Sequence, residues 1–334
     1  MNKVVCVEFD CVFEEDSYAC LIVIYGFIHY RLGGFMFEFK AEQKVFEIAG
    51  VKIGGVPGLN PTVLAGTIFY HGHKIVKDEK KGVFDKTEAE RLIRLQEEFS
   101  EKTGNPCMVD VMAANPEAMR KYLEFVVEVT DKPIVIDGVT ADIRIAGIEY
   151  ASETGFIDRV VYNSIVPEYR PEELEKIKET GLKAAVLLAF NTKDFTTRGR
   201  INALNELIKL AGEIGVEKPL LDTCIIDVPS LGMACKALLE VKSETGLPTG
   251  CSPHNAVSTW RGLKQKMGRQ AVKPCAASAN VAAAMLGADF ILYGPIKDCD
   301  VVFPSVAMID AAQAYLLFEK GIKVGKDHPL FKIA

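Results

Sequence analysis

The sequence lacks the features of a nucleic-acid binder, a zinc ribbon and a disulfide-rich scaffold. Acidic residues outnumber basic ones, 45 to 39, which gives a net charge of −6 at pH 7, whereas a general nucleic-acid binder usually carries a basic face. The nine cysteines form no CxxC pair, which argues against both zinc and disulfide frameworks. No stretch is of low complexity. A cytosolic protein with reduced thiols and no nucleic-acid partner is therefore the favoured interpretation.

The first 35 residues differ from the rest, yet they lack the marks of a membrane span or a signal peptide. Their apolar run, YACLIVIYGFI at 18–28, is far shorter than the roughly 20 residues that a spanning helix needs. The segment is acidic, whereas a signal peptide begins with a basic region. Met36 opens a stretch that resembles a natural beginning. We predict that residues 1–35 are a dispensable extension or a start miscall, and that residues 36–334 form one domain.

One helix-ending signal recurs along the chain. Glycine after the last helical turn adopts the left-handed conformation that closes a helix. An apolar, β-rich segment soon follows each of these signals, so the pattern predicts repeated βα units. The Thr-Gly pairs lie at 103–104, 154–155, 180–181 and 245–246.

Helix starts are also marked. Asp85 and Glu88 predict a capping box, in which each side chain satisfies a free amide of the first turn. Asn115 is the expected N-cap of a second helix, with Pro116 at its first position. The segment 303–320 predicts the last helix of the domain.

Eight apolar segments predict a sheet, and such segments fit parallel strands buried on both faces. Eight βα units predict a (β/α)8 TIM barrel. The alternative is a doubly wound open sheet, which is disfavoured because the chain has no P-loop and no GxGxxG after its first strand. The predicted strands are 63–69, 107–112, 133–137, 159–163, 183–190, 219–224, 247–251 and 289–293.

Polar residues at the carboxyl ends of these strands are the candidates for an active site, because that end of a barrel carries the catalytic loops. They are mostly carboxylates and amides, with no obvious nucleophile. Such a ring suits a flat heterocycle, since a carboxylate accepts two parallel hydrogen bonds from an aminopyrimidine edge. The candidates are His71, His73, Asp110, Asp137, Asn163, Asn191, Asp222, His254 and Asn255.

His71 and His73 could instead form part of a metal site. Residues i and i+2 of an extended chain point to the same side, as in barrel metallohydrolases. Such a site would need further ligands from later strands, where His254 is the sole histidine. We therefore expect no bound metal and a pair that orients a loop or contacts an organic ligand. A metal-dependent hydrolase is kept as the alternative.

Structural roles stay open for several candidates. Asp110 and Asp137 could each cap the helix that follows, and Asn163 could be a turn residue. His254 fits a cavity wall better than a general base. Asp222 is followed by Thr-Cys-Ile-Ile, so no helix begins there and a role in a site is favoured.

The strand-end motifs also carry a resemblance. KPIVIDG, RVVYNSI, PLLDTC, GCSPHN and FILYGPI, with GTIFYHGHKIVKDEKKGVFDK near the start, resemble the H-subunit family of the archaeal tetrahydromethanopterin S-methyltransferase from about residue 36 to about residue 300. More broadly, the chain is similar to pterin-binding barrels such as dihydropteroate synthase and methyltetrahydrofolate:corrinoid methyltransferases. The resemblance implies transfer of the N5-methyl group of methyl-tetrahydromethanopterin to a cob(I)amide on a partner corrinoid protein, in one-carbon metabolism of the methanogenesis type.

Residue roles carry over through the same motifs. The resemblance implies that Asp137, Asn163 and Asp222 bind the pterin and that Asn255 lies near N5. We expect the Asn255 side chain to donate a hydrogen bond as that nitrogen leaves and solvent to supply the proton. Residue 71 is not a histidine in the family pattern, which weakens the metal interpretation. The segment 191–200 is shorter than in the family, which leaves the docking corrinoid protein open. The additional site wall would comprise Asp110, His71, His73, Asn191 and His254.

The resemblance also implies a corrinoid carrier protein and a membrane-bound complex as partners. A cytoplasmic protein, attached peripherally to the cytoplasmic face of the membrane, follows from that complex. A homodimer is the default for such barrels. Alternatives are another methyl donor, transfer toward the pterin, a dihydropteroate synthase type of activity, and a non-catalytic scaffold subunit.

Overall fold

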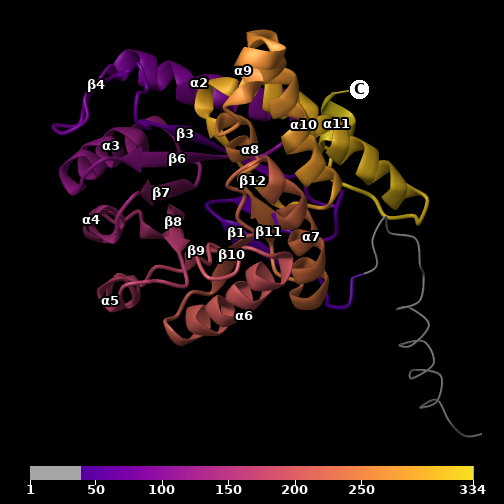
Figure 1. Ribbon diagram of the computed structural model, residues 1–334, viewed down its shortest axis with the longest axis horizontal. Helices are drawn as coiled ribbons and strands as arrows, with labels where there is room; N and C mark the ends of the chain where they lie inside the picture. The colour runs from indigo at the N-terminus through magenta and orange to yellow at the C-terminus, as the bar shows by residue number, and fades with distance from the viewer. Residues whose placement is uncertain (1–38, 334) are drawn as a thin grey trace, which may run out of the picture. The chain divides into compact units, whose positions relative to one another are not determined.

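Eight parallel strands close into a barrel in the order β3-β6-β7-β8-β9-β10-β11-β12 (Figure 1). The computed structural model describes residues 39–333. The predicted extension 1–35 and its boundary at Met36 lie outside the described residues and stay predictions. Every barrel strand overlaps a predicted one, so the (β/α)8 prediction is confirmed and the open-sheet alternative is wrong. The strands are β3 Val63–Ile68, β6 Cys107–Ala113, β7 Ile134–Gly138, β8 Val160–Ile165, β9 Ala184–Leu188, β10 Lys218–Asp222, β11 Thr249–Cys251 and β12 Phe290–Pro295.

Helices follow the strands and cover the outside of the barrel (Figure 1). The connection between β11 and β12 is unusual because it holds two short helices, α8 His254–Ser258 and α9 Gly262–Met267, before its long helix α10 Val272–Met285. The other helices are α2 Lys86–Thr103, α3 Pro116–Val129, α4 Ala141–Glu153, α5 Pro171–Glu179, α6 Thr197–Glu213, α7 Val228–Thr245, α11 Cys299–Phe318 and α12 Pro329–Lys332.

The local signals act largely as predicted. The glycines of the four Thr-Gly pairs all have positive φ, between 68° and 83°. Asn115 caps α3 by accepting a hydrogen bond from the Ala118 amide at 2.9 Å. Asp85 caps α2 through the Glu88 amide at 3.1 Å, but the predicted capping box is wrong in its second half. The Asp85 amide donates to Ile75 O, and the Glu88 carboxylate pairs with Arg91.

A hairpin closes the amino-terminal end of the barrel. Strands β1 Val45–Ile48 and β2 Val51–Gly54 pair antiparallel, joined by a turn in which Ala49 and Gly50 both have positive φ, as a two-residue hairpin turn requires. Hydrophobic side chains of the hairpin, such as Ile53, form one cluster with residues inside the barrel, such as Phe290. The apolar interior is therefore filled from this end, and space is left at the carboxyl ends of the strands.

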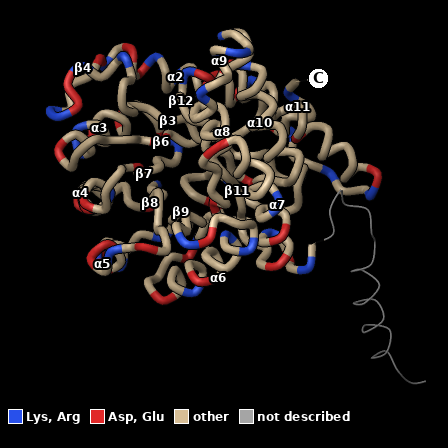
Figure 2. The backbone as a smooth tube through the Cα atoms, viewed as in Figure 1, with Lys and Arg blue, Asp and Glu red and all other residues tan. Residues whose placement is uncertain are grey.

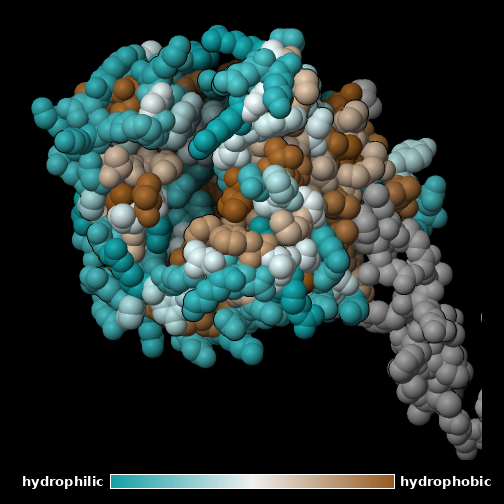
Figure 3. Space-filling view, in the orientation of Figure 1, coloured by the Kyte–Doolittle hydropathy of each residue, from teal (hydrophilic) through white to brown (hydrophobic). Residues whose placement is uncertain are grey.

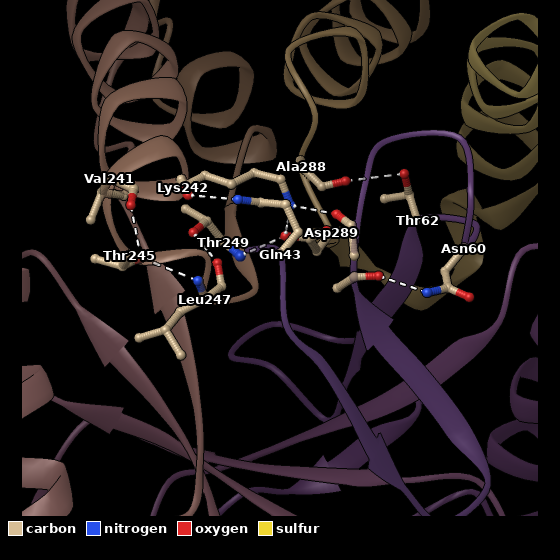
Figure 4. Close-up of polar contacts among 12 residues, drawn as sticks. Gln43, Asn60, Thr62, Val241, Lys242, Thr245, Leu247, Thr249, Ala288 and Asp289 are labelled. Carbon is tan, nitrogen blue, oxygen red and sulfur yellow. Dashed lines mark hydrogen bonds and ion pairs between the residues drawn. The ribbon is translucent and has the colours of Figure 1, made fainter. Parts of the chain in front are cut away.

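A buried ion pair supports the same end (Figure 4). Lys242 of α7 and Asp289, the residue before β12, have side chains only 1% and 6% exposed. The Lys242 ammonium also donates to Gly55 O at 3.1 Å, and the Asp289 carboxylate also accepts from the Thr249 amide at 2.8 Å. Loss of one partner of such a pair typically costs about 3–5 kcal/mol, because the other charge stays buried. The pair thus ties α7, β11 and β12 to the segment before β3.

One helical stretch among residues 39–333, Ile296–Phe318, is long and apolar enough to cross a membrane by length and composition alone. Half of that window is buried, and α11 packs on α10 and α2. Burial of this kind is what a core helix shows.

Candidate active site

A cavity of about 570 Å³ opens at the carboxyl ends of the barrel strands. Figure 3 shows the surface hollowed near the middle of the view, with hydrophobic patches beside the hollow. Most of the predicted site residues meet in this cavity, although they come from five different strands or the loops after them. The predicted residues that line it are Asp110, Asp137, Asn163, Asp222, His254 and Asn255.

Asp222 ends β10 and is only 1% exposed. One carboxylate oxygen accepts from the Cys224 amide at 2.7 Å, and the other accepts from the Ser252 hydroxyl at 3.1 Å. Cys224 has a φ of 62°, an uncommon conformation for a residue other than glycine, and the turn brings its amide back to the carboxylate. Burial raises the pKa of Asp222 to about 6. No helix starts directly after Asp222, as predicted: the next helix, α7, begins after its N-cap residue Asp227.

Asp110 and Asp137 bring two more carboxyl groups from neighbouring strands, β6 and β7. Asp110 accepts from the Thr67 hydroxyl at 2.6 Å, but its other oxygen is buried and has no hydrogen-bond partner among the described residues. Burial, aided by the charge of Asp137, raises the pKa of Asp110 well above its ordinary value. Burial also raises the pKa of Asp137 to about 6, against the opposing effect of Arg144. A buried acceptor without a partner is what a ligand N–H would satisfy.

The structural alternatives for these residues do not hold. Helix α3 is capped by Asn115 and the N-cap position of α4 is Thr140, so neither Asp110 nor Asp137 caps a helix. Asn163 lies within β8, directly opposite Asp137 of β7, and is not a turn residue. The two side chains are therefore neighbours in the sheet as well as in the cavity lining.

Asn255 and His254 are held by the short helix α8. The Asn255 side-chain amide donates to Ile225 O at 2.9 Å, which uses one of its two N–H groups and fixes its orientation. His254 Nδ1 lies 3.1 Å from Leu292 O, and burial lowers the pKa of the ring. A Cβ at Gly294 would lie 2.6 Å from the ring, so only glycine lets β12 pass this close. A neutral His254 fits the predicted wall residue.

The prediction that His71 and His73 point to one side of an extended chain is wrong. Phe69 and Gly72 both have positive φ, 64° and 75°, so the chain turns as soon as β3 ends. The His71 ring is 92% exposed and pairs with Glu79 at 3.0 Å. His73 is 7% exposed, accepts from the Phe69 amide at 3.2 Å, and stacks on Tyr70. Neither histidine lines the cavity.

Asn191 also lies outside the cavity lining. Its side-chain oxygen accepts from the Lys193 amide at 3.0 Å, so it stabilises a turn in the loop after β9. Its predicted place in the site wall is therefore wrong.

Several lining residues were not predicted. Tyr70, Thr67 and Ser252 line the cavity, and the last two donate hydrogen bonds to Asp110 and Asp222. The alternation of side chains between the two faces of β3 could have predicted Thr67 as a lining residue, because Thr67 shares a face with the interior residues Val63 and Ala65. Ser252 lies inside the GCSPHN motif but was passed over for its neighbours.

Among residues 39–333, no group of three or more His, Cys, Asp and Glu side chains has an arrangement that could hold a metal ion. The carboxylates of the cavity are instead bonded to hydroxyl and amide donors of the protein. The carboxyl oxygens of the cavity are hydrogen-bond acceptors, so they suit an organic ligand that offers N–H groups.

Comparison with known proteins identifies the family. The model of the family described as tetrahydromethanopterin S-methyltransferase MtrH subunit matches residues 41–325. The chain belongs to this family. The H subunit of the tetrahydromethanopterin S-methyltransferase from Methanothermobacter marburgensis is 44% identical over 309 residues, which cover 89% of this chain and all of the relative. The H subunit of a putative mtx methyltransferase from Methanosarcina barkeri is 38% identical, over 88% of this chain and 99% of the relative.

Solved structures of dihydropteroate synthases have a similar fold. The Yersinia pestis enzyme bound to a pterine-sulfa conjugate has a TM-score of 0.59 and 14% identity, over 82% of this chain and 100% of that one. The Xanthomonas albilineans enzyme with 4-aminobenzoic acid has a TM-score of 0.58 and 15% identity, over 82% and 99%. At this identity the likeness concerns the fold alone. The predicted barrel type, family and enzyme class, a methyltransferase, are confirmed.

Proposed function

We propose that this chain transfers the N5-methyl group of methyl-tetrahydromethanopterin to a corrinoid carried by a partner protein. The observation that carries the proposal is the buried carboxyl oxygen of Asp110, which has no hydrogen-bond partner among residues 39–333, in a cavity that also holds Asp137, Asn163 and Asp222. An aminopyrimidine ring offers several N–H donors together with acceptors, and this set of carboxylates and amides matches it. The family of the chain supports the same substrate.

Asp222, Asp137 and Asn163 are the proposed pterin-binding residues. Each oxygen of a carboxylate can accept two hydrogen bonds, so Asp222 can bind a ring N–H and an exocyclic amine while it keeps Ser252 and the Cys224 amide. Asn163, opposite Asp137 in the sheet, can donate and accept where the ring offers both. Asp110 supplies the remaining acceptor, and His254 forms part of the wall of the site.

The corrinoid supplies the nucleophile, a reduced cobalt, so the barrel itself needs none. Its residues bind and orient the methyl donor so that the N5-methyl faces the open mouth. The electron pair of the broken C–N bond stays on N5, which then takes a proton from solvent. Asn255 keeps a second side-chain N–H after its bond to Ile225, and we assign it the hydrogen bond to N5 that eases this departure.

The proposed reaction requires a protein that brings the corrinoid to the mouth of the barrel. The relatives are named as subunits, which agrees with a chain that acts in a complex. We propose the corrinoid carrier as the direct partner, a cytoplasmic location that includes peripheral attachment to the membrane, and a homodimer.

The proposal is tested by calorimetric titration of the purified full chain with methyl-tetrahydromethanopterin and, separately, methyl-tetrahydrofolate. We expect saturable binding of the methanopterin derivative by protein that contains no stoichiometric metal, with metal content measured on the same sample. A protein that binds neither pterin and carries near-stoichiometric zinc or iron would overturn the proposal.

Binding of the pterin should weaken as the pH falls below about 6. The pKa values of Asp222 and Asp137 are raised to about 6 in the free protein, so both carboxyls are protonated below that pH. The N–H donors of the pterin need these carboxyls in the ionised form, so below about pH 6 each carboxyl must lose its proton before the pterin binds. For each carboxyl, this lowers the affinity by up to about tenfold for every pH unit below about 6. Titrations between pH 5 and 8 should show this fall below about pH 6.

Two buffers of different ionisation enthalpy report the proton release directly. At pH 5.5 the apparent binding enthalpy should differ between the buffers, and the difference should be smaller at pH 8, where Asp222 and Asp137 are ionised before binding. An affinity that stays constant from pH 5 to 8 would contradict the ionised state assigned to these carboxylates.

A further inference from the structure

A second cavity, of about 390 Å³, lies beside the first and belongs to the connection between β11 and β12. It is bordered by α8, α9, α10 and α11. His254, Ser258 and Pro295 line both cavities, so the two spaces are neighbours across a thin wall. Ser258 is exposed, and a long ligand can pass over it from one cavity to the other. We call this second space the Trp260 cavity.

The segment that builds the Trp260 cavity has an unusual charge. The whole chain is acidic, yet no Asp or Glu occurs between Glu244 and Asp289. Figure 2 shows blue residues on and beside α9. The basic residues of this segment are Arg261, Lys264, Lys266, Arg269 and Lys273.

Most of these cations have no acidic partner within the part of the chain that the structure describes. Lys273 pairs with Asp300 at 3.0 Å, whereas Arg261 and Lys264 line the cavity without an ion pair to residues 39–333. One acid, Asp298, also lines the cavity, with Lys297 next to it in sequence. The net charge at the cavity is therefore positive, which favours an anionic ligand.

The uncharged part of the lining is apolar and aromatic. Trp260, the one tryptophan in the sequence, is 39% exposed and lies next to Arg261. Val257 and Leu263 contribute aliphatic surface. A half-exposed indole beside unpaired cations suits a ligand with a ring or sugar in its middle and phosphate or carboxylate groups toward its end.

We infer that the Trp260 cavity binds the anionic tail of the pterin methyl donor, the part remote from N5. This inference rests on the proposed function, which places the pterin head in the first cavity. The tail of methyl-tetrahydromethanopterin carries an arylamine, sugar units, a phosphodiester and carboxylates, so it needs an aromatic wall followed by cations. The lining supplies both: Ser258 borders the two cavities, and Trp260, Arg261 and Lys264 line the second cavity but not the first.

Binding of the tail has a consequence for the reaction. Arg261 and Lys264 line the second cavity and not the first, which holds the carboxylates, so their contacts add affinity without touching the reacting atoms. Binding energy from remote parts of a substrate can hold the reacting group in place. The same cations distinguish a donor with a phosphorylated tail from one that has carboxylates alone.

The test compares two double variants of the full chain. The first, Arg261→Ala with Lys264→Ala, removes the cations that line the cavity. The matched control, Lys266→Ala with Arg269→Ala, removes the same charge from the same segment at residues outside the lining. Each protein is titrated calorimetrically with methyl-tetrahydromethanopterin and with N5-methyl-tetrahydropterin, which has no tail. Thermal unfolding checks that both variants are folded.

We expect the first variant to lose affinity for the complete donor by about tenfold or more, as for a lost charge-assisted hydrogen bond, and to bind the tail-free pterin like the wild type. The control should match the wild type with both ligands. Equal loss in both variants would mean a general charge effect and would overturn the inference. Unchanged affinity of the first variant for the complete donor would also overturn the inference. If that variant in addition methylated free cobalamin more slowly, the cations would instead bind the phosphate of the acceptor.

Failure of the proposed function gives a different result. In that case the wild type binds neither the complete donor nor the tail-free pterin. A wild type that binds both with the same affinity leaves the proposed function standing and overturns only the tail site.

Discussion

Replacement of Asp222 with Ala should weaken binding of the pterin by at least about a hundredfold while the barrel stays folded. The proposed contact consists of two hydrogen bonds to a charged acceptor, and such bonds contribute about 1.5–3 kcal/mol each. Stability should change little, because the buried carboxylate is costly to desolvate, as its raised pKa shows. The loss of that cost offsets the loss of the acceptor for Ser252 and the Cys224 amide. Calorimetry gives the affinity and thermal denaturation gives the stability.

Asp222→Asn makes the test sharper. The asparagine has nearly the same shape and can still accept from the Cys224 amide, but it places an N–H where the pterin offers its own N–H groups. Its effect on affinity should therefore be at least as large as that of alanine. Asp142→Asn is the matched control, since Asp142 is an exposed residue of α4 that pairs with Arg170. Unchanged affinity in both Asp222 variants would refute the role of this residue.

The barrel could be predicted because its signals are local. Each strand is an apolar run, and each Thr-Gly pair ends a helix at a glycine with positive φ, so short windows of sequence contain the information. The hairpin of β1 and β2 was not predicted. Its four-residue strands are partly exposed, and it is stabilised by residues inside the barrel that lie far away in the sequence.

The candidate site could be predicted only in part, for a related reason. Asp222 is the last residue of its strand and Asp137 the next to last, so their position follows from the strand boundaries. His71 and His73 depend instead on the backbone after β3, where Phe69 adopts a positive φ that no sequence rule expects of a phenylalanine. Thr67 was missed because a threonine within an apolar strand is more often structural.

The second cavity, in the connection between β11 and β12, could not be predicted from a sequence motif. GCSPHN predicts the residues that reach the first cavity, but the cations that follow it have no motif. Their relation to the site depends on how α8, α9 and α10 pack on one another, and only the structure shows that His254 and Ser258 separate two neighbouring cavities. Absence of acidic residues over 245–288 is the one sequence signal that could have drawn attention to it.

Replacement of Asn255 with Ala should lower the rate of methyl transfer by about a hundredfold or more and change pterin affinity by less than about threefold. The hydrogen bond to N5 strengthens as that nitrogen gains electron density, so it acts on the transition state more than on the bound substrate. Single-turnover methylation of free cob(I)alamin gives the rate of the chemical step, and calorimetry gives the affinity. Asn163→Ala, at the pyrimidine side, should show the opposite division, with affinity lost more than rate.

The bond from Asn255 to Ile225 makes a second comparison informative. Asn255→Asp has the same size but no N–H to donate, and it would set a carboxylate against the Ile225 carbonyl, so its rate should fall at least as far as that of the alanine variant. Asn255→Gln keeps the donor on a longer side chain and should recover part of the rate as N5 comes within reach. Equal losses of rate and affinity in Asn255→Ala would contradict the proposed role, because they would place Asn255 among the residues that only bind the pterin.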